Sequence, residues 1–139
     1  MKIQKLNQKL TSERVYGVHF PYPPISLPAD DSGRLCAAEN ATRAHYTTLV
    51  LVADDNNSPA ILEFSESVLS GLAAYAKRHG DLSTIEILVS RDDDGKIRLR
   101  VGKTTDSDDV QILAAAYADV YEGLYAKYIS KIGRKLDDL

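Results

Sequence analysis

The alternation of residue types between positions 85 and 101 constrains the fold of this chain more than any other feature. Successive side chains of a β-strand point to opposite faces of the sheet, so an apolar residue at every second position predicts a strand with one buried face. The segment 96–101 has this pattern, with one face made of Ile97, Leu99 and Val101 and the other of Lys96, Arg98 and Arg100.

The preceding segment, 85–90, places Ile85, Ile87 and Val89 on one face. In a hairpin, a loop of odd length brings these residues to the same side as the apolar residues of the next strand, whereas an even loop places them beside the basic ones. A loop over 93–95 is odd and ends in a glycine, which can adopt the left-handed conformation that such loops require. We therefore expect a hairpin with one apolar and one basic face.

A further hairpin and a helix are predicted upstream. The segment 46–53 is rich in β-branched and apolar residues, and 60–64 is a shorter strand-like run after the turn 54–59. The segment 66–79 then has apolar residues at helical spacing, Ser65 in the N-cap position and a glycine directly after its last turn. We expect a helix over 66–79 that lies between the two hairpins.

The first third of the chain is less regular. Residues 1–15 form a mildly basic arm, expected to be a short helix or disordered. Four prolines within 19–28 exclude a helix there and hold the backbone extended. The segment 29–33 predicts a turn, and 34–44 is compatible with either a strand or a short helix.

Residues 110–136 are predicted to form one long helix, because apolar and tyrosine side chains recur at spacings of three and four. At roughly 1.5 Å per residue this helix would be about 40 Å long, whereas a domain of this size has a radius of gyration of about 14 Å. The helix would therefore follow the whole sheet, break at Gly123 or Gly133, or project towards a partner.

Together these elements predict an α+β fold. We expect an antiparallel sheet or partial OB-like barrel of about four to six strands, in which two hairpins flank one helix, followed by a long C-terminal helix. The length of 139 residues fits a single domain. Residues 1–107 would hold the sheet, the basic arm and the first helix, and residues 108–139 the helix that packs on it or mediates assembly.

Composition narrows the possible functions. A net charge of −3 excludes a uniformly basic surface but not a local basic face. With Cys36 as the single cysteine and three histidines, we expect no internal disulfide and no structural zinc site. The sequence contains no apolar run as long as a signal peptide or a membrane helix, so we expect a cytoplasmic protein. We also expect that it uses no cofactor and no metal.

The basic face of the second hairpin suggests a nucleic-acid site. Strand residues two apart lie about 7 Å from each other, close to the spacing of successive phosphates, and aromatic rings near basic residues can stack on bases. The simpler alternative is a solvated face, with Glu86 and Asp92 as cross-strand partners, and rings that cover the core. The predicted nucleic-acid-binding residues are Lys96, Arg98, Arg100, Arg43, Tyr46, Phe20 and Tyr22.

The C-terminal helix suggests an alternative function. Its tyrosines form one stripe, and tyrosine is enriched at protein contacts. In this alternative the protein is a small interaction module, an inhibitor or an assembly subunit, that acts through this helix. We expect a homo-oligomer whose interface contains Tyr117, Tyr121, Leu124 and Tyr128.

Signals for catalysis are weak. The tripeptide His45-Tyr46-Thr47 is similar to one half of the His-x-Thr pair of two-histidine phosphoesterases, but the sequence contains no second copy. It also contains no glycine-rich phosphate loop and no nucleophile elbow. We therefore expect no enzymatic activity.

The stretch 60–72, the pair Gly80-Asp81 and the stretch 85–92 resemble viral single-stranded DNA-binding proteins with an OB-type barrel. The shared pattern is a strand ending in Leu-Glu, a Ser-x-x-Val helix, a Gly-Asp pair, and a strand that runs into an arginine and a glycine turn. The resemblance covers about a third of the chain. It implies a viral or mobile-element origin, the host-cell cytoplasm, and a role in covering exposed DNA during replication or recombination.

This chain departs from that pattern in two ways. It lacks the zinc-type cysteines that some of these proteins have. After the Gly95 turn it has basic and aliphatic residues where the pattern would place an aromatic one. The resemblance therefore implies phosphate contacts on this strand rather than base stacking.

Overall fold

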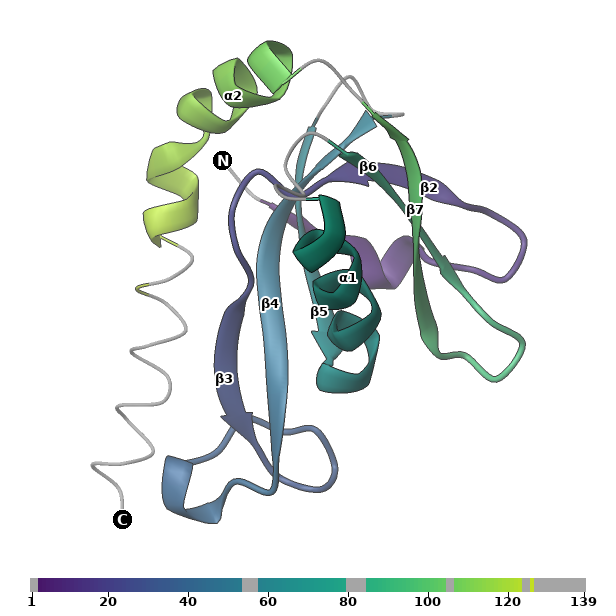
Figure 1. Cartoon of the computed structure of the whole chain (residues 1–139). Coiled ribbons are helices and arrows are strands. Elements are labelled where there is room, and N and C mark those ends of the chain that lie inside the picture. The colour runs from purple at the N-terminus through teal and green to yellow at the C-terminus, as the bar shows by residue number, and fades with distance from the viewer. Residues whose placement is uncertain (1–2, 54–57, 80–84, 105–106, 124–125, 127–139) are drawn as a thin grey trace.

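Seven β-strands and two α-helices make up the described part of the chain (Figure 1). The computed structural model describes residues 3–53, 58–79, 85–104, 107–123 and 126. In chain order the elements are β1 (Gln4–Lys5), η1 (a 3-10 helix, Leu6–Lys9), β2 (Tyr16–His19), β3 (Ile25–Ala29), η2 (a 3-10 helix, Ala38–Asn40), β4 (Arg43–Val52), β5 (Ser58–Ser65), α1 (Glu66–His79), β6 (Ile85–Arg91), β7 (Ile97–Thr104) and α2 (Ser107–Ala116).

All seven strands belong to one mixed sheet, in which six follow the order β1-β5-β4-β2-β6-β7 and β3 pairs with β4 outside this order. The long strand β4 organises this sheet, because it pairs with β5 on one side and with both β3 and β2 on the other. β1 pairs in parallel with β5, and the remaining pairs are antiparallel. The sheet is open, since β1 and β7 stand at its two ends and do not pair with each other.

The predicted fold class is therefore wrong. The sheet is mixed rather than antiparallel, it does not close into a barrel, and it has more strands than expected. The additional strands are short: Gln4–Lys5 lies in the basic arm, Tyr16–His19 precedes the prolines, and Ile25–Ala29 lies among them. β1 and β2 contain too few residues to show an alternating pattern, and β3 alternates but contains Pro28. The three strands form here because β4, β5 and β6 offer backbone groups with which to pair.

The first predicted hairpin and the helix after it are present. β4 and β5 pair antiparallel over eight residue pairs, from His45–Ser65 to Val52–Ser58. Pro59 lies inside β5, opposite Leu51, rather than in the turn. The helix α1 has the predicted bounds, with Glu66 in its first turn where the helix dipole stabilises an anion.

The second predicted hairpin has the predicted register. In the β6–β7 pairing Ile87 lies opposite Val101 and Val89 lies opposite Leu99. Gly95 has a φ of 81°, in the left-handed region that favours glycine. The apolar residues of both strands therefore share one face, as the loop length predicts.

The segment 29–44 resolves into a turn and a short helix. Gly33 has a φ of 85°, and the N–H of Asp30 donates to the carbonyl of Arg34 at 2.9 Å, so the predicted turn is present. Leu35 then forms an isolated bridge with Ala29, and η2 follows before β4 begins. The segment 34–44 therefore contains both predicted alternatives, a short helix over 38–40 and strand residues at Leu35 and at the start of β4.

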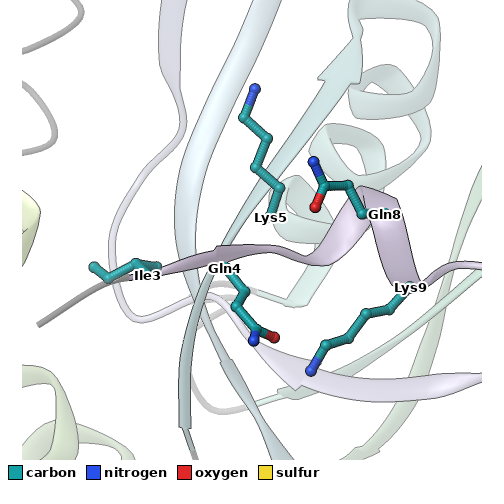
Figure 2. Close-up of a pocket in the computed structure, with 5 residues that line it drawn as sticks. All are labelled: Ile3, Gln4, Lys5, Gln8 and Lys9. Atoms are coloured by element: carbon teal, nitrogen blue, oxygen red, sulfur yellow. The ribbon is translucent and has the colours of Figure 1, made fainter.

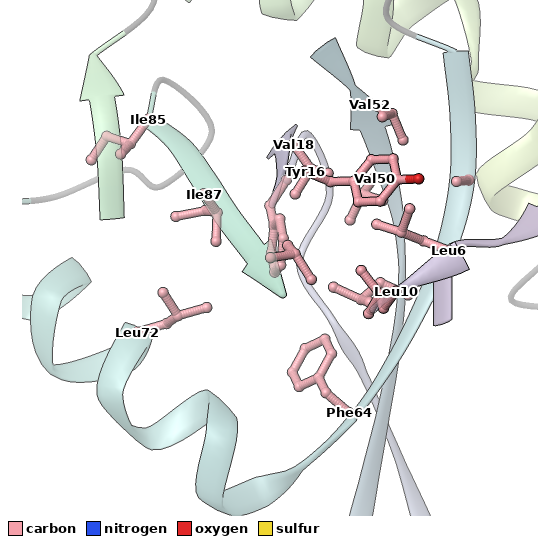
Figure 3. Close-up of a cluster of buried hydrophobic side chains, with 14 residues drawn as sticks. Leu6, Leu10, Tyr16, Val18, Val50, Val52, Phe64, Leu72, Ile85 and Ile87 are labelled. Atoms are coloured by element: carbon pink, nitrogen blue, oxygen red, sulfur yellow. The ribbon is translucent and has the colours of Figure 1, made fainter. Parts of the chain in front are cut away.

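The larger core cluster lies between one face of the sheet and the elements α1 and η1 (Figure 3). Leu72 is the most buried described residue of α1, and η1 with its flank contributes Leu6 and Leu10. The sheet contributes buried side chains from four strands, β2, β4, β5 and β6. They are Tyr16, Val18, Val50, Val52, Ala60, Leu62, Phe64, Ile85, Ile87 and Val89.

A smaller cluster lies on the opposite face of β3, β4 and β5. Its buried members are Ile25, Leu27, Leu49 and Ile61. The residues that follow α2 pack against it, and these are Tyr117, Val120 and Tyr121. The C-terminal part of the described chain therefore lies on its own sheet.

The long C-terminal helix predicted for 110–136 is not found in the described residues. The helix α2 begins at Ser107 and ends at Ala116, and helical backbone resumes over 118–123 after a turn residue. The carbonyl of Ala114 accepts hydrogen bonds from the Tyr22 hydroxyl and, at 3.1 Å, from the N–H of Tyr117. These bonds tighten the last turn and end the helix.

The remainder of that prediction, 124–125 and 127–136, lies outside the described residues. In the part of the chain that the structure describes, no helix is long and apolar enough to cross a membrane.

Candidate nucleic-acid interface

The basic residues of the β6–β7 hairpin lie on the face opposite to the core. Arg98 lies opposite Ser90 and Arg100 lies opposite Leu88. Lys96, Arg98 and Arg100 are all exposed, whereas the alternating residues of β7 pack against the core cluster. Because β7 is the last strand of the sheet, this basic face reaches the free edge.

Asp92 fixes the turn from which these residues project. Its Oδ1 accepts the backbone N–H groups of Asp94 at 3.0 Å and Lys96 at 2.9 Å. Its Oδ2 lies 3.4 Å from Nε of Arg98. These hydrogen bonds lower the pKa of the Asp92 carboxyl, and the bond from the Lys96 N–H has the largest effect. Asp92 therefore orients Arg98 along the basic face.

Arg100 differs from Arg98 in forming no ion pair with a described acid. Within the described ranges, no carboxylate forms an ion pair with Arg100 or Lys96. Their charges are therefore available to a ligand. Of the two acids expected to balance this face, Asp92 forms an ion pair with Arg98.

Phe20 and Tyr46 belong to the core side of the sheet. Phe20 is 5% exposed and its ring centroid lies 6.2 Å from that of Phe64. Tyr46 lies opposite Phe64 in the β4–β5 pairing, and their rings stack with centroids 6.0 Å apart. Phe20 is therefore buried, and Phe64 covers one face of the partly buried Tyr46 ring.

Tyr22 also has a ring partner. Its ring stacks on that of Tyr121 with centroids 4.2 Å apart and an interplanar angle of 11°. Burial raises the pKa of Tyr22, and the nearby Tyr121 and Glu122 raise it further by smaller amounts. The structure thus places Tyr22 in the contact between the sheet and the C-terminal segment.

Arg43 lies apart from the other predicted basic residues. It is exposed at the start of β4, where it pairs with Ala29 of β3. The strands β2 and β6 separate β4 from β7 in the sheet. The structure therefore brings together Lys96, Arg98 and Arg100, and leaves Arg43 outside this group.

Two of the four predicted interface tyrosines and leucines can be placed. Tyr117 and Tyr121 are partly buried against the smaller core cluster. The hydroxyl of Tyr121 donates to the carbonyl of Pro23 at 3.2 Å. Leu124 and Tyr128 lie outside the described residues. A single chain does not test the predicted oligomer.

The sequence analysis missed the role of Arg91. Its guanidinium donates to the carbonyl of Gly95 at 2.7 Å and to the carbonyl of Asn7 at 2.9 Å. It therefore joins the turn of the basic hairpin to η1. The sequence gives no signal for this role, because an arginine at the end of a strand does not reveal a partner as distant in the chain as Asn7.

A second group of polar side chains lies beside β1. The carboxylate of Glu63 lies 3.2 Å from Nζ of Lys5 and 3.6 Å from Nε2 of His45. A shallow depression nearby is lined by Ile3, Gln4, Lys5, Gln8 and Lys9. Figure 2 shows Lys5 and Gln8 on one side of the chain and Gln4 and Lys9 on the other. These side chains do not converge on one point.

Among the described residues, no three histidine, cysteine, aspartate or glutamate side chains are grouped so that they could hold a metal ion. No family model, no curated protein and no solved structure matches this chain.

Proposed function

We propose that this protein binds single-stranded nucleic acid, mainly through contacts to the phosphate backbone, on the basic face of the β6–β7 hairpin. The observation that supports this proposal is the joint exposure of Lys96, Arg98 and Arg100 on one face of an edge strand. On the resemblance given above, the nucleic acid would be DNA exposed during replication or recombination.

The arrangement suits an extended chain of phosphates. Arg98 and Arg100 are two strand residues apart, about 7 Å, on a β-strand. Arg98 is oriented by Asp92 while its side chain remains 66% exposed. A ligand can approach β7 both from its outer face and from the sheet edge, where no described strand follows.

The packed rings limit the proposal to electrostatic contacts. Because Phe20, Tyr22 and Tyr46 each contact another ring, base stacking on them is not included. Binding through phosphates depends steeply on salt and weakly on sequence, since it releases counterions and does not touch base edges.

The test is binding of a fluorescently labelled oligonucleotide at a series of salt concentrations. Replacing Arg98 and Arg100 together by Ala should weaken binding and reduce the slope of log K against log salt by about 1.4, or about 0.7 for each contact. The matched control is Lys77→Ala with Arg78→Ala, which removes two exposed cations from α1 instead. Equal slopes for the two double variants would contradict the proposal.

A further inference from the structure

Glu86 stands between two glycines at the centre of the outer face of β2, β6 and β7. A Cβ atom on Gly17 would lie 2.8 Å from Cδ and Oε2 of Glu86. A Cβ atom on Gly102 would lie 3.3 Å from its Oε1 and 3.0 Å from its backbone oxygen. The carboxylate therefore occupies space that only glycine leaves open on either side.

This carboxylate has no hydrogen-bond donor among the described residues. The other acid on this face, Asp92, uses both of its oxygens on the turn and on Arg98. Glu86 is half-buried and forms no ion pair with a described lysine or arginine. An anionic acceptor in that state is costly unless a ligand or water supplies the donors.

His19 adds an independent observation at the same place. Its side chain is 4% exposed, its Nδ1 has no partner within the described ranges, and the charge of Glu86 acts on its ring. Burial lowers the pKa of His19 against the opposing effect of Glu86. A neutral His19 leaves the charge of Glu86 uncompensated at neutral pH.

The position of Glu86 relative to Arg100 matches one nucleotide. Arg100 lies opposite Leu88, so Glu86 is its diagonal neighbour, about 7–8 Å away. A phosphate held by Arg100 would place the attached base over Leu88, the residue opposite Arg100. The Glu86 carboxylate lies over Gly17, which is the cross-strand neighbour of Leu88, so the edge of that base would meet Glu86.

We propose that Glu86 accepts hydrogen bonds from the base edge and gives this site a preference for guanine. The inference rests on the proposed function. The Watson–Crick edge of guanine presents two adjacent donors, N1–H and N2–H, which match the two oxygens of a carboxylate. Thymine offers one N–H between two carbonyl oxygens, which repel the second carboxylate oxygen. Hypoxanthine lacks the N2 amino group and keeps only one of the two bonds.

The test compares three labelled oligonucleotides of roughly 16 nucleotides, a length that covers one small binding domain. They are alternating thymine–guanine, alternating thymine–hypoxanthine, and thymine alone. In an alternating sequence, a shift of one nucleotide brings a purine to Glu86 in any register. The wild type should bind the guanine oligonucleotide about tenfold more tightly than the thymine one, with hypoxanthine between them.

Glu86→Gln should remove this preference, because the amide replaces one acceptor by a donor. Gly17→Ala should reduce it, since the new methyl group displaces the carboxylate without changing its charge. The matched control is Glu39→Gln, an equal charge change on exposed η2, which should keep the preference.

The outcomes separate the two proposals. Equal binding of all three oligonucleotides by the wild type, or an unchanged preference in Glu86→Gln, would overturn the inference and leave the proposed function standing. Failure of the wild type to bind any oligonucleotide would overturn both.

Discussion

The side chain of Asn7 forms with Glu63 both of the hydrogen bonds that a neighbouring strand would form. Its Nδ2 donates to the carbonyl of Glu63 at 2.7 Å, and its Oδ1 accepts the N–H of Glu63 at 2.9 Å. The strand β1 ends at Lys5, which pairs with Ile61. The amide of Asn7 therefore continues the pairing along β5 after the backbone has turned into η1, and covers an edge that would otherwise be open.

This relationship makes Asn7 a stability residue. Replacing Asn7 by Ala should lower the free energy of unfolding by about 1–3 kcal/mol, because the partly buried N–H and carbonyl of Glu63 lose both partners. Unfolding in urea measures the effect. The neighbouring exposed substitution Gln8→Ala is the control and should change stability little. Equal stabilities of the two variants would show that water replaces the Asn7 amide without cost.

The turn of the basic hairpin gives a second prediction. Gly95 has a φ of 81°, so Gly95→Ala should cost about 1–2 kcal/mol through left-handed strain. The same exchange at Gly71, in an exposed and open position of α1, should instead stabilise the protein by about 0.5–1 kcal/mol. Thermal unfolding of the two variants tests the contrast. A shift of the same sign in both would contradict the role assigned to the turn.

The predictability of this fold depends on how local its signals are. The register of β6 and β7 follows from residues that are neighbours in the sequence, because Ile87, Val89, Leu99 and Val101 must share a face. The pairing of β1 with β5 joins positions 4–5 to 60–61, and the polar pair Gln4-Lys5 carries no strand pattern. β1 can pair only after β4 and β5 have formed their hairpin, because this hairpin provides the strand edge with which β1 pairs.

The same distinction applies to the candidate site. The alternation that separates Arg98 and Arg100 from the core is visible in the sequence, and the structure keeps it. Tyr22 is next to prolines in the sequence, but its hydroxyl reaches Ala114, 92 positions away. Aromatic residues near basic ones suggest stacking on bases, whereas long-range packing against Phe64 and Tyr121 decides where those rings lie.

His19 predicts a pH dependence of stability. Burial lowers the pKa of its ring below the usual histidine value of 6.5. Above that value the ring is neutral in both the folded and unfolded states, so protonation of His19 does not reduce the free energy of unfolding. As the pH falls below 6.5, the unfolded chain takes up a proton first, and stability is lost until the folded pKa is reached.

Urea unfolding between about pH 8 and about pH 5 measures this loss. His19→Asn should flatten the curve in that range. Glu86→Gln should steepen it, because the Glu86 charge raises the pKa of His19 and its removal lowers that pKa further. A wild-type curve with no fall below pH 6.5 would contradict the assignment of a neutral, buried His19.

Tyr121 separates two roles of the C-terminal segment. Its ring stacks on Tyr22, and its hydroxyl donates to the carbonyl of Pro23 at 3.2 Å. If its main role is this packing, Tyr121→Ala should lower the free energy of unfolding by about 3 kcal/mol, as expected for truncating a large aromatic side chain at a core. The effect should then be independent of protein concentration. If Tyr121 instead stabilises an oligomer, the loss should depend on concentration, and sedimentation should show a smaller species than the wild type.

The control is Ile112→Ala on α2, since Ile112 is 69% exposed and its truncation removes little packing within the chain. If Ile112→Ala dissociates the oligomer while Tyr121→Ala leaves it assembled, the interface lies on the exposed side of α2. Tyr121 would then belong to the core of its own chain.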